Sequence, residues 1–136
     1  MNEEMLGMRH AALFVKDMAK TRQFYEEWIG LSVIWAPDPD NIYLTSGRDN
    51  IALHTAPEGH VFEGGNLDHI GFLFRSSAGV DAVYDILVNA GVGIHHERKQ
   101  HRDDSYSFYA HDPDGVLVQF LYEPNVAAAE SALSSR

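Results

Sequence analysis

The order of the predicted secondary-structure elements is repeated along this 136-residue chain, and this repeat constrains the fold more than any other feature. A strand-like segment at residues 10–15 is followed by a helical segment at 18–29. A second strand-like segment at 69–74 is followed by a helical segment at 80–89, whose apolar residues recur with helical spacing. Recurring supersecondary units are the signature of duplication, so the chain is predicted to hold two copies of one module.

Matching positions in the two halves support the duplication. His10 and His69 open the first strands 59 residues apart, and Tyr25 and Tyr84 in the two helices have the same separation. After each helix come a glycine, a run with β-branched residues and two further strand-like segments around a turn. Each half therefore has the order strand, helix and three strands. The alternative is a coincidence, because strand–helix pairs are common.

The predicted boundaries give two modules, a linker and a tail within one compact domain. The first βαβββ module spans residues 8–55 and the second spans 67–123. Glycine-rich residues 56–66 form the linker, and the polar, alanine-rich residues 124–136 form a tail with weak helix potential. Inside the first module, the Pro-Asp-Pro-Asp sequence at residues 37–40 predicts a turn, because proline fixes φ and aspartate bonds to nearby backbone.

Charge and composition exclude several classes of function. The chain has ten Lys and Arg residues and 20 Asp and Glu residues. The resulting net charge of −10 repels nucleic acid and anionic membrane surfaces. The lack of cysteine excludes disulfides, zinc–thiolate sites, iron–sulfur clusters and cysteine nucleophiles. The start of the chain is acidic and no run of 18 apolar residues occurs, so we expect neither a signal peptide nor a spanning helix and predict a cytoplasmic location.

Alternation along the predicted strands sorts the side chains onto two faces of each sheet. One face is apolar and is predicted to be covered by the helices. The other face collects polar groups and is predicted to line a pocket. Its members include His10, Ala52, His54, His69 and Gln119.

The pattern resembles the vicinal oxygen chelate superfamily, which includes glyoxalase I, fosfomycin- and bleomycin-resistance proteins, methylmalonyl-CoA epimerase and type I extradiol dioxygenases. The resemblance covers about residues 8–123. It rests on His10, Phe24-Tyr25, Gly30-Leu31, His69 and Asp112-Pro113-Asp114-Gly115. It implies an α+β fold in which two tandem βαβββ modules form a partly open mixed β-barrel around a central pocket.

The resemblance also implies a divalent metal site. Its ligands would be His10, His69 and, on the last strand, Gln119, where the family usually has glutamate. Glyoxalase-type members take a fourth ligand at the position of Ala52, which has no donor atom, so glyoxalase I itself is disfavoured. Fe or Mn is favoured over Zn or Ni, and a metal-free pocket is the alternative.

The three-ligand pattern is closest to the extradiol dioxygenases. Their fingerprint matches His101, Phe108-Tyr109 and the Asp-Pro-Asp-Gly turn, and it departs at Lys99 and at Gln119. The resemblance gives His101 the role of proton shuttle and Tyr109 the role of hydrogen-bond donor to substrate. The alternative for His101 is a solvated loop residue. The predicted substrate-binding residues are Ala52, His54 and Phe108, with a shifted metal ligand as a second option for His54 and a core position for Phe108.

Two functions follow from this reading. The first is a small metal-dependent enzyme, similar to an extradiol dioxygenase, that acts on a small molecule such as an aromatic diol. The alternative is a metal-free protein that binds and sequesters a small molecule, as bleomycin-resistance proteins do. Both have a small-molecule partner and neither has a nucleic-acid or membrane partner. A homodimer is predicted, because a chain of two modules leaves sheet edges to cover.

Overall fold

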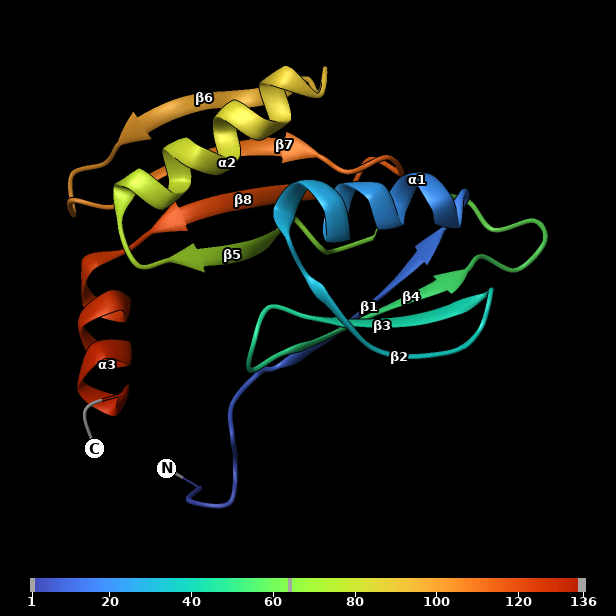
Figure 1. Ribbon diagram of the computed structural model, residues 1–136, viewed down its shortest axis with the longest axis horizontal. Helices are drawn as coiled ribbons and strands as arrows, with labels where there is room; N and C mark the ends of the chain where they lie inside the picture. Colours follow the sequence, from blue (N-terminus) through green and yellow to red (C-terminus); the bar gives the residue numbers. More distant parts are fainter. Residues whose placement is uncertain (1, 64, 135–136) are drawn as a thin grey trace. The chain divides into compact units, whose positions relative to one another are not determined.

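The computed structural model of the chain describes residues 2–63 and 65–134. The fold is α+β, and the chain divides into two units, Met1–Phe62 and Glu63–Arg136. Each unit contains one four-stranded mixed sheet (Figure 1). The two units are described in turn.

The first unit has the predicted order of strand, helix and three strands. In its sheet the order is β1-β4-β3-β2, with β1 parallel to β4 and the other pairs antiparallel. The strands are β1 (His10–Val15), β2 (Ser32–Asp38), β3 (Asn41–Thr45) and β4 (Asn50–Thr55), and the helical segment consists of α1 (Met18–Arg22) and the π-helix η1 (Gln23–Ile29).

The second unit repeats this topology. Its sheet has the order β5-β8-β7-β6, again with the first pair parallel and the others antiparallel. The elements are β5 (Ile70–Phe74), α2 (Ser77–Asn89), β6 (Ile94–Gln100), β7 (Tyr106–His111), β8 (Leu117–Tyr122) and α3 (Pro124–Ser134). The two tandem βαβββ modules predicted from the sequence are therefore confirmed.

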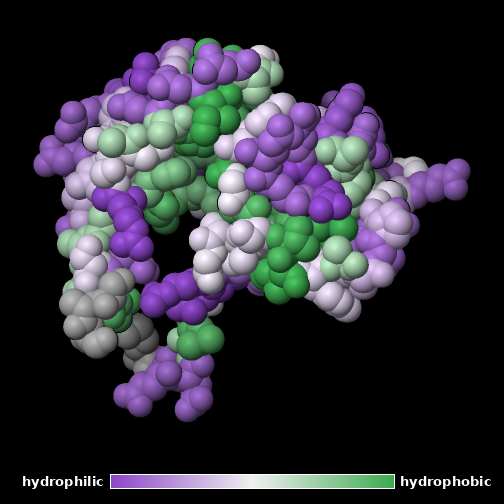
Figure 2. Space-filling model, viewed as in Figure 1, coloured by the Kyte–Doolittle hydropathy of each residue, from purple (hydrophilic) through white to green (hydrophobic). Residues whose placement is uncertain are grey.

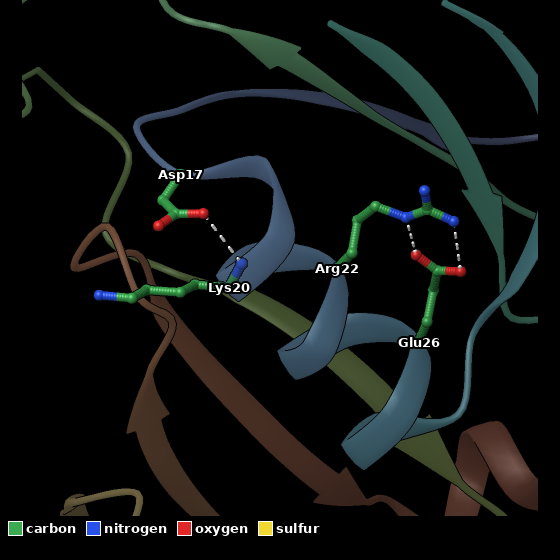
Figure 3. A network of polar contacts seen from close by, with 4 residues as sticks. All are labelled: Asp17, Lys20, Arg22 and Glu26. Carbon is green, nitrogen blue, oxygen red and sulfur yellow. Dashed lines mark hydrogen bonds and ion pairs between the residues drawn. The ribbon is translucent and has the colours of Figure 1, made fainter. Parts of the chain in front are cut away.

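Side-chain bonds mark the start and the middle of the first helical segment (Figure 3), and a glycine marks its end. Asp17 is the N-cap, and its carboxylate accepts a hydrogen bond from the backbone N–H of Lys20 at 3.2 Å. One turn later, Arg22 forms a two-pronged ion pair with Glu26. Gly30 ends the helical segment with φ of 96°, a left-handed conformation that favours glycine.

The helical segment predicted at 18–29 is confirmed, with π-helical pairing in its second half. Three local predictions need correction. The predicted turn at 37–40 is shorter, since β2 continues to Asp38 and the turn lies at residues 39–40. Pro37 is tolerated there because β2 is an edge strand, which needs fewer ladder bonds. Strand β6 extends to Gln100, well beyond the β-branched run that predicted it, and the tail contains the regular helix α3.

Each unit buries one face of its sheet. In the second unit, α2 packs on β5, β7 and β8 (Figure 1), and the buried set consists of Phe72, Val80, Val83, Leu87, Phe108, Ala110, Val118 and Phe120. The first unit buries Leu13, Val15, Phe24, Tyr25, Leu31, Ile42, Leu44, Ile51, Ala52 and Leu53. Each large apolar side chain buried in this way contributes about 1.5 to 3 kcal/mol of transfer free energy.

The surface is mixed in polarity. Figure 2 shows hydrophobic side chains, in green, among hydrophilic ones in purple. In the first unit, Val33, Ile34 and Trp35 of the edge strand β2 are exposed, with 59% of Trp35 accessible. Among the described residues, no helix has the length and apolar character needed to cross a membrane.

Candidate functional site

The strand register places Tyr109, one of the two predicted catalytic residues, on the open face of the second sheet. Residues paired directly across neighbouring strands project on the same side of a sheet. Tyr109 pairs with Gln119, and Ser107, two residues before Tyr109, pairs with Lys99 on β6. These four side chains therefore share the face opposite the one on which Phe108 and Phe120 pack.

A chain of hydrogen bonds connects three polar side chains on this face. The amide Nε2 of Gln119 donates to the Ser107 hydroxyl at 3.2 Å. The same oxygen lies 3.1 Å from Nε2 of His101. A serine hydroxyl both accepts and donates hydrogen bonds, so Ser107 can link Gln119 to His101. Ser107 is buried, with 2% of it exposed, whereas His101 is exposed.

Tyr109 lies between two imidazoles of the same unit. Its ring meets His69 edge-on with centroids 5.3 Å apart, and it meets His96 edge-on at 5.5 Å. His69 donates from Nδ1 to the Asp68 carboxylate at 2.6 Å. The other ring nitrogen, Nε2, takes no part in this bond. The contact of His69 with Tyr109 and the pairing of Tyr109 with Gln119 thus bring these three residues into one neighbourhood of the second unit.

Two hollows open on this side of the second unit. The first has a volume of about 750 Å³ and is lined by residues that include Lys99, His101, Tyr109 and Gln119. The second, of about 710 Å³, shares Lys99, His101 and Tyr109 and adds Ser107. The candidate catalytic groups therefore border space large enough for a small organic molecule.

The turn between β7 and β8 holds the register of Tyr109 against Gln119. The Asp112 carboxylate accepts hydrogen bonds from the backbone N–H groups of Asp114 and Val116, each at 2.9 Å. Gly115 completes the turn with φ of 88°. Asp112 is buried, so this Asp-Pro-Asp-Gly turn holds the register in which Tyr109 faces Gln119.

The first unit presents a second set of predicted residues. His10 donates from Nδ1 to the side-chain oxygen of Asn50 at 2.8 Å, and His54 donates likewise to Asn41 at 2.7 Å. Ala52, between His54 and Asn50 on β4, is fully buried and pairs with Ala12. The ring of Tyr43 stacks on Trp35 with centroids 5.2 Å apart and meets His54 edge-on at 5.7 Å.

Phe108 does not occupy the position of a ligand-binding residue. It is fully buried, stacks on Phe120 at 4.7 Å and meets Tyr84 of α2 edge-on at 5.2 Å. Since it follows Ser107 and precedes Tyr109 on a regular strand, its ring projects to the helix side. Phe108 is therefore a core residue, which was the alternative to its prediction as a substrate-binding residue.

The side chains predicted as metal ligands each keep one donor atom outside the hydrogen bonds described above. Within the described part of the chain, no three His, Asp or Glu side chains cluster closely enough to hold an ion. His10 and His69 nevertheless both use Nδ1 on a neighbouring oxygen, an arrangement that leaves Nε2 for a metal and orients the ring. Gln119 uses its NH₂ group on Ser107, which leaves its carbonyl oxygen as a neutral donor. Joint ligation by these three residues stays a prediction.

Comparisons with known proteins identify the family of the chain. Residues 7–120 match the family model described as Glyoxalase/Bleomycin resistance protein/Dioxygenase superfamily. The chain belongs to this superfamily. A curated relative, 2,2',3-trihydroxybiphenyl dioxygenase of Sphingomonas paucimobilis, is 25% identical over 120 residues, which are 85% of this chain. The chain spans only 40% of the length of that dioxygenase.

Solved structures share the superfamily fold. A fosfomycin resistance protein, FosX, from Listeria monocytogenes has a TM-score of 0.73 at 21% identity, over 90% of this chain and 98% of that one. A lactoylglutathione lyase from Agrobacterium tumefaciens has a TM-score of 0.68 at 19% identity, over 88% and 96% of the two chains. At these identities the likeness extends to the fold alone.

Sequence reasoning missed several residues around this superfamily site. Ser107 joins Gln119 to His101, and Asp68 and Asn50 hold the two strand-opening histidines. The spacing of two residues between Ser107 and Tyr109 on a predicted strand was the available signal for a shared face. The asparagine that holds His10 is 40 positions away in the sequence, so no local pattern could identify it.

Proposed function

We propose that this chain is a small metal-dependent enzyme of the superfamily that cleaves an aromatic diol in the manner of an extradiol dioxygenase. The hydrogen-bonded chain from Gln119 through Ser107 to His101, with Tyr109 on the same face, carries this proposal. It links the residue at the third-ligand position to the residue at the proton-shuttle position. The match to a dioxygenase that acts on a trihydroxybiphenyl supports the same reaction class.

The proposal assigns His10, His69 and Gln119 as the ligands of the metal, with Fe or Mn preferred. When bound, such an ion supplies a site at which a diol and oxygen are activated together. The neutral set of two imidazoles and one amide gives the ion little charge compensation, so its affinity is expected to be modest.

The protein groups around the diol would move and hold protons. His101 accepts a proton from the diol and returns it later, because imidazole changes charge near neutral pH. Ser107 orients that imidazole through its hydroxyl, and Tyr109 donates a hydrogen bond to a substrate oxygen. Tyr109 is held for this role by the edge-on contacts of His69 and His96.

A second candidate function is metal-free binding of a small aromatic molecule. The stack of Tyr43 on the exposed Trp35 favours it, since such a platform offers area to a planar ligand. Ala52 favours it too, because this position has no donor atom where glyoxalase-type members have a ligand.

Metal analysis separates the two functions. Protein purified without added metal is analysed before and after reconstitution with Fe²⁺ or Mn²⁺, and a simple catechol is then added under air in a single-turnover absorbance assay. The enzyme proposal expects one metal ion per chain and a yellow ring-opened product. Binding of catechol without any retained metal would instead favour the sequestration function.

Assembly and location complete the proposal. A homodimer is expected because β1, β2, β5 and β6 are the edge strands of the two described sheets, and exposed edges invite pairing or cover. A cytoplasmic location and a small-molecule partner are part of the same proposal. Size-exclusion chromatography with light scattering measures the oligomeric state directly.

A further inference from the structure

The strand β6 carries two cationic side chains, Arg98 and Lys99, beside the hollows of the second unit. Over β6 and the loop after it, residues 94–105 contain three Lys and Arg residues, three histidines, one glutamate and two aspartates, so the formal charges balance. A single cation beside a hollow favours binding of an anion where its charge has no partner within the protein.

Two charged residues of β6 are already engaged by helix α2. Arg98 donates to the Asp81 carboxylate at 2.9 Å and lies over the ring of Tyr84 at 4.0 Å. Glu97 accepts from the Tyr84 hydroxyl at 2.7 Å. These residues hold β6 against the helix, and the charge of Arg98 is compensated there by Asp81.

Lys99 is different. Its pairing with Ser107 places it on the open face, and it lines both hollows together with His101 and Tyr109. Among the described residues it has no ion-pair or hydrogen-bond partner. It is also one of the two positions at which the chain departs from the extradiol fingerprint, where small or β-branched residues are usual.

The two acidic side chains that line the first hollow, Asp103 and Glu123, accept hydrogen bonds from neighbouring residues. Asp103 accepts from the Ser105 backbone N–H at 3.0 Å and from the Ser105 hydroxyl at 2.6 Å. Glu123 accepts from Asn125 at 3.1 Å and from the Val126 backbone N–H at 2.8 Å, where it caps α3. Arg102 also lines the first hollow, from the loop after β6. Lys99 is the cation that shares the strand face of Ser107, Tyr109 and Gln119.

We propose that Lys99 binds a carboxylate group of the ligand, so that the molecule taken by this site is an anionic aromatic compound. The inference rests on the proposed function only in placing that ligand beside His101 and Tyr109. An ammonium in a partly enclosed hollow forms a charge-assisted hydrogen bond with a carboxylate. A neutral diol of the same shape gains nothing from it.

The test compares two ligands that differ only in charge. Binding of 3,4-dihydroxybenzoate and of its methyl ester is measured by calorimetry at low salt, anaerobically, on the protein as purified and after Mn²⁺ loading. We expect the acid to bind about fivefold to tenfold more tightly than the ester in the wild type. Lys99→Met should remove this preference by weakening the acid alone, Lys99→Arg should retain it, and 0.5 M salt should reduce it.

A matched control and the contrary outcomes make the test decisive. Lys20→Met removes the same charge from α1 in the first unit and should change neither affinity. Equal binding of acid and ester in the wild type, equal weakening of both by Lys99→Met, or no binding of either compound would overturn the assignment. Intact Mn²⁺ binding with no acid preference rejects Lys99 alone, whereas an acid preference without metal binding or turnover rejects the proposed function alone.

Discussion

The amide of Gln119 donates a hydrogen bond to the hydroxyl of Ser107 at 3.2 Å across neighbouring strands. The bond uses the NH₂ group of the amide, and in this orientation the carbonyl oxygen of Gln119 is left to face a metal or a ligand. The same serine oxygen contacts His101, the candidate proton shuttle. A substitution at residue 119 is therefore expected to alter the hydrogen bonding of His101.

Gln119→Glu should strengthen binding of Fe²⁺ and Mn²⁺ by more than tenfold. A carboxylate adds a Coulomb attraction of a few kcal/mol at an effective dielectric constant near 20, and desolvation removes part of it. The new side chain keeps the link to Ser107, because a carboxylate accepts from the serine hydroxyl. Metal titration of both proteins measures the change.

The control for this substitution is Gln23→Glu, which adds the same charge on the exposed side of η1 in the first unit. It should leave metal affinity unchanged. If Gln119→Glu binds metal no better than the wild type, residue 119 is not a ligand. If the wild type already holds metal tightly, the neutral amide is not the limiting feature.

Removing His101 or the hydroxyl of Tyr109 should slow ring cleavage without releasing metal. His101→Ala loses the proton shuttle, whose contribution is about 100-fold to 10,000-fold in general acid–base catalysis. Tyr109→Phe loses one hydrogen bond to substrate and should cost about tenfold. Single-turnover absorbance with catechol gives the rates, and metal analysis of the same samples gives the occupancy.

Ser107→Ala distinguishes positioning from catalysis. It removes the hydroxyl that contacts His101 but leaves the imidazole, so the rate should fall less than in His101→Ala, and the pH profile of the rate should shift. A rate and pH profile identical to those of the wild type would show that the His101–Ser107 contact has no role in turnover.

Strand periodicity predicted the fold. Alternation placed Gln119 on the face opposite Phe120, and the register confirms that arrangement. The same alternation along β7 places Phe108 with the core, which was the alternative to its prediction as a substrate-binding residue. The length of strand β6 was underestimated because its polar residues show no apolar alternation. An exposed edge strand does not need such alternation.

Contacts between distant segments could not be predicted from the sequence. The partner of Ser107 depends on the register of β7 against β8, which the Asp112 turn sets, and on rotation of a hydroxyl group. Propensity is a local quantity and does not contain this information.

Asp112→Ala should lower the free energy of unfolding by about 1 to 2 kcal/mol, because the backbone N–H groups of Asp114 and Val116 lose their acceptor. Asp112→Asn keeps an oxygen at the same place and should cost clearly less. Urea denaturation followed by circular dichroism measures both variants. Equal losses in the two would mean that the charge of Asp112, and not its hydrogen bonding, stabilises the turn.

Asp81→Asn should destabilise the protein near neutral pH and lose this effect in acid. The Tyr106 hydroxyl donates to the Asp81 carboxylate at 2.6 Å and Arg98 donates to the same oxygen at 2.9 Å, and these bonds lower the pKa of Asp81. A lowered folded-state pKa means that the stabilisation is complete above the unfolded pKa of about 3.9 and is lost as the pH falls through the folded value.

The expected loss at pH 7 is about 0.5 to 1 kcal/mol, because 43% of the Asp81 side chain is exposed and water screens its ion pair with Arg98. Urea denaturation at pH 7, 5 and 3.5 should give similar differences between variant and wild type at the two higher values and a smaller difference at pH 3.5. Asp85→Asn removes the same charge from α2 at an exposed position and should have little effect at any of these values. A difference for Asp81→Asn that stays constant down to pH 3.5 would show that the hydrogen-bonding shape of the side chain, and not its ionisation, holds β6 and β7 against the helix.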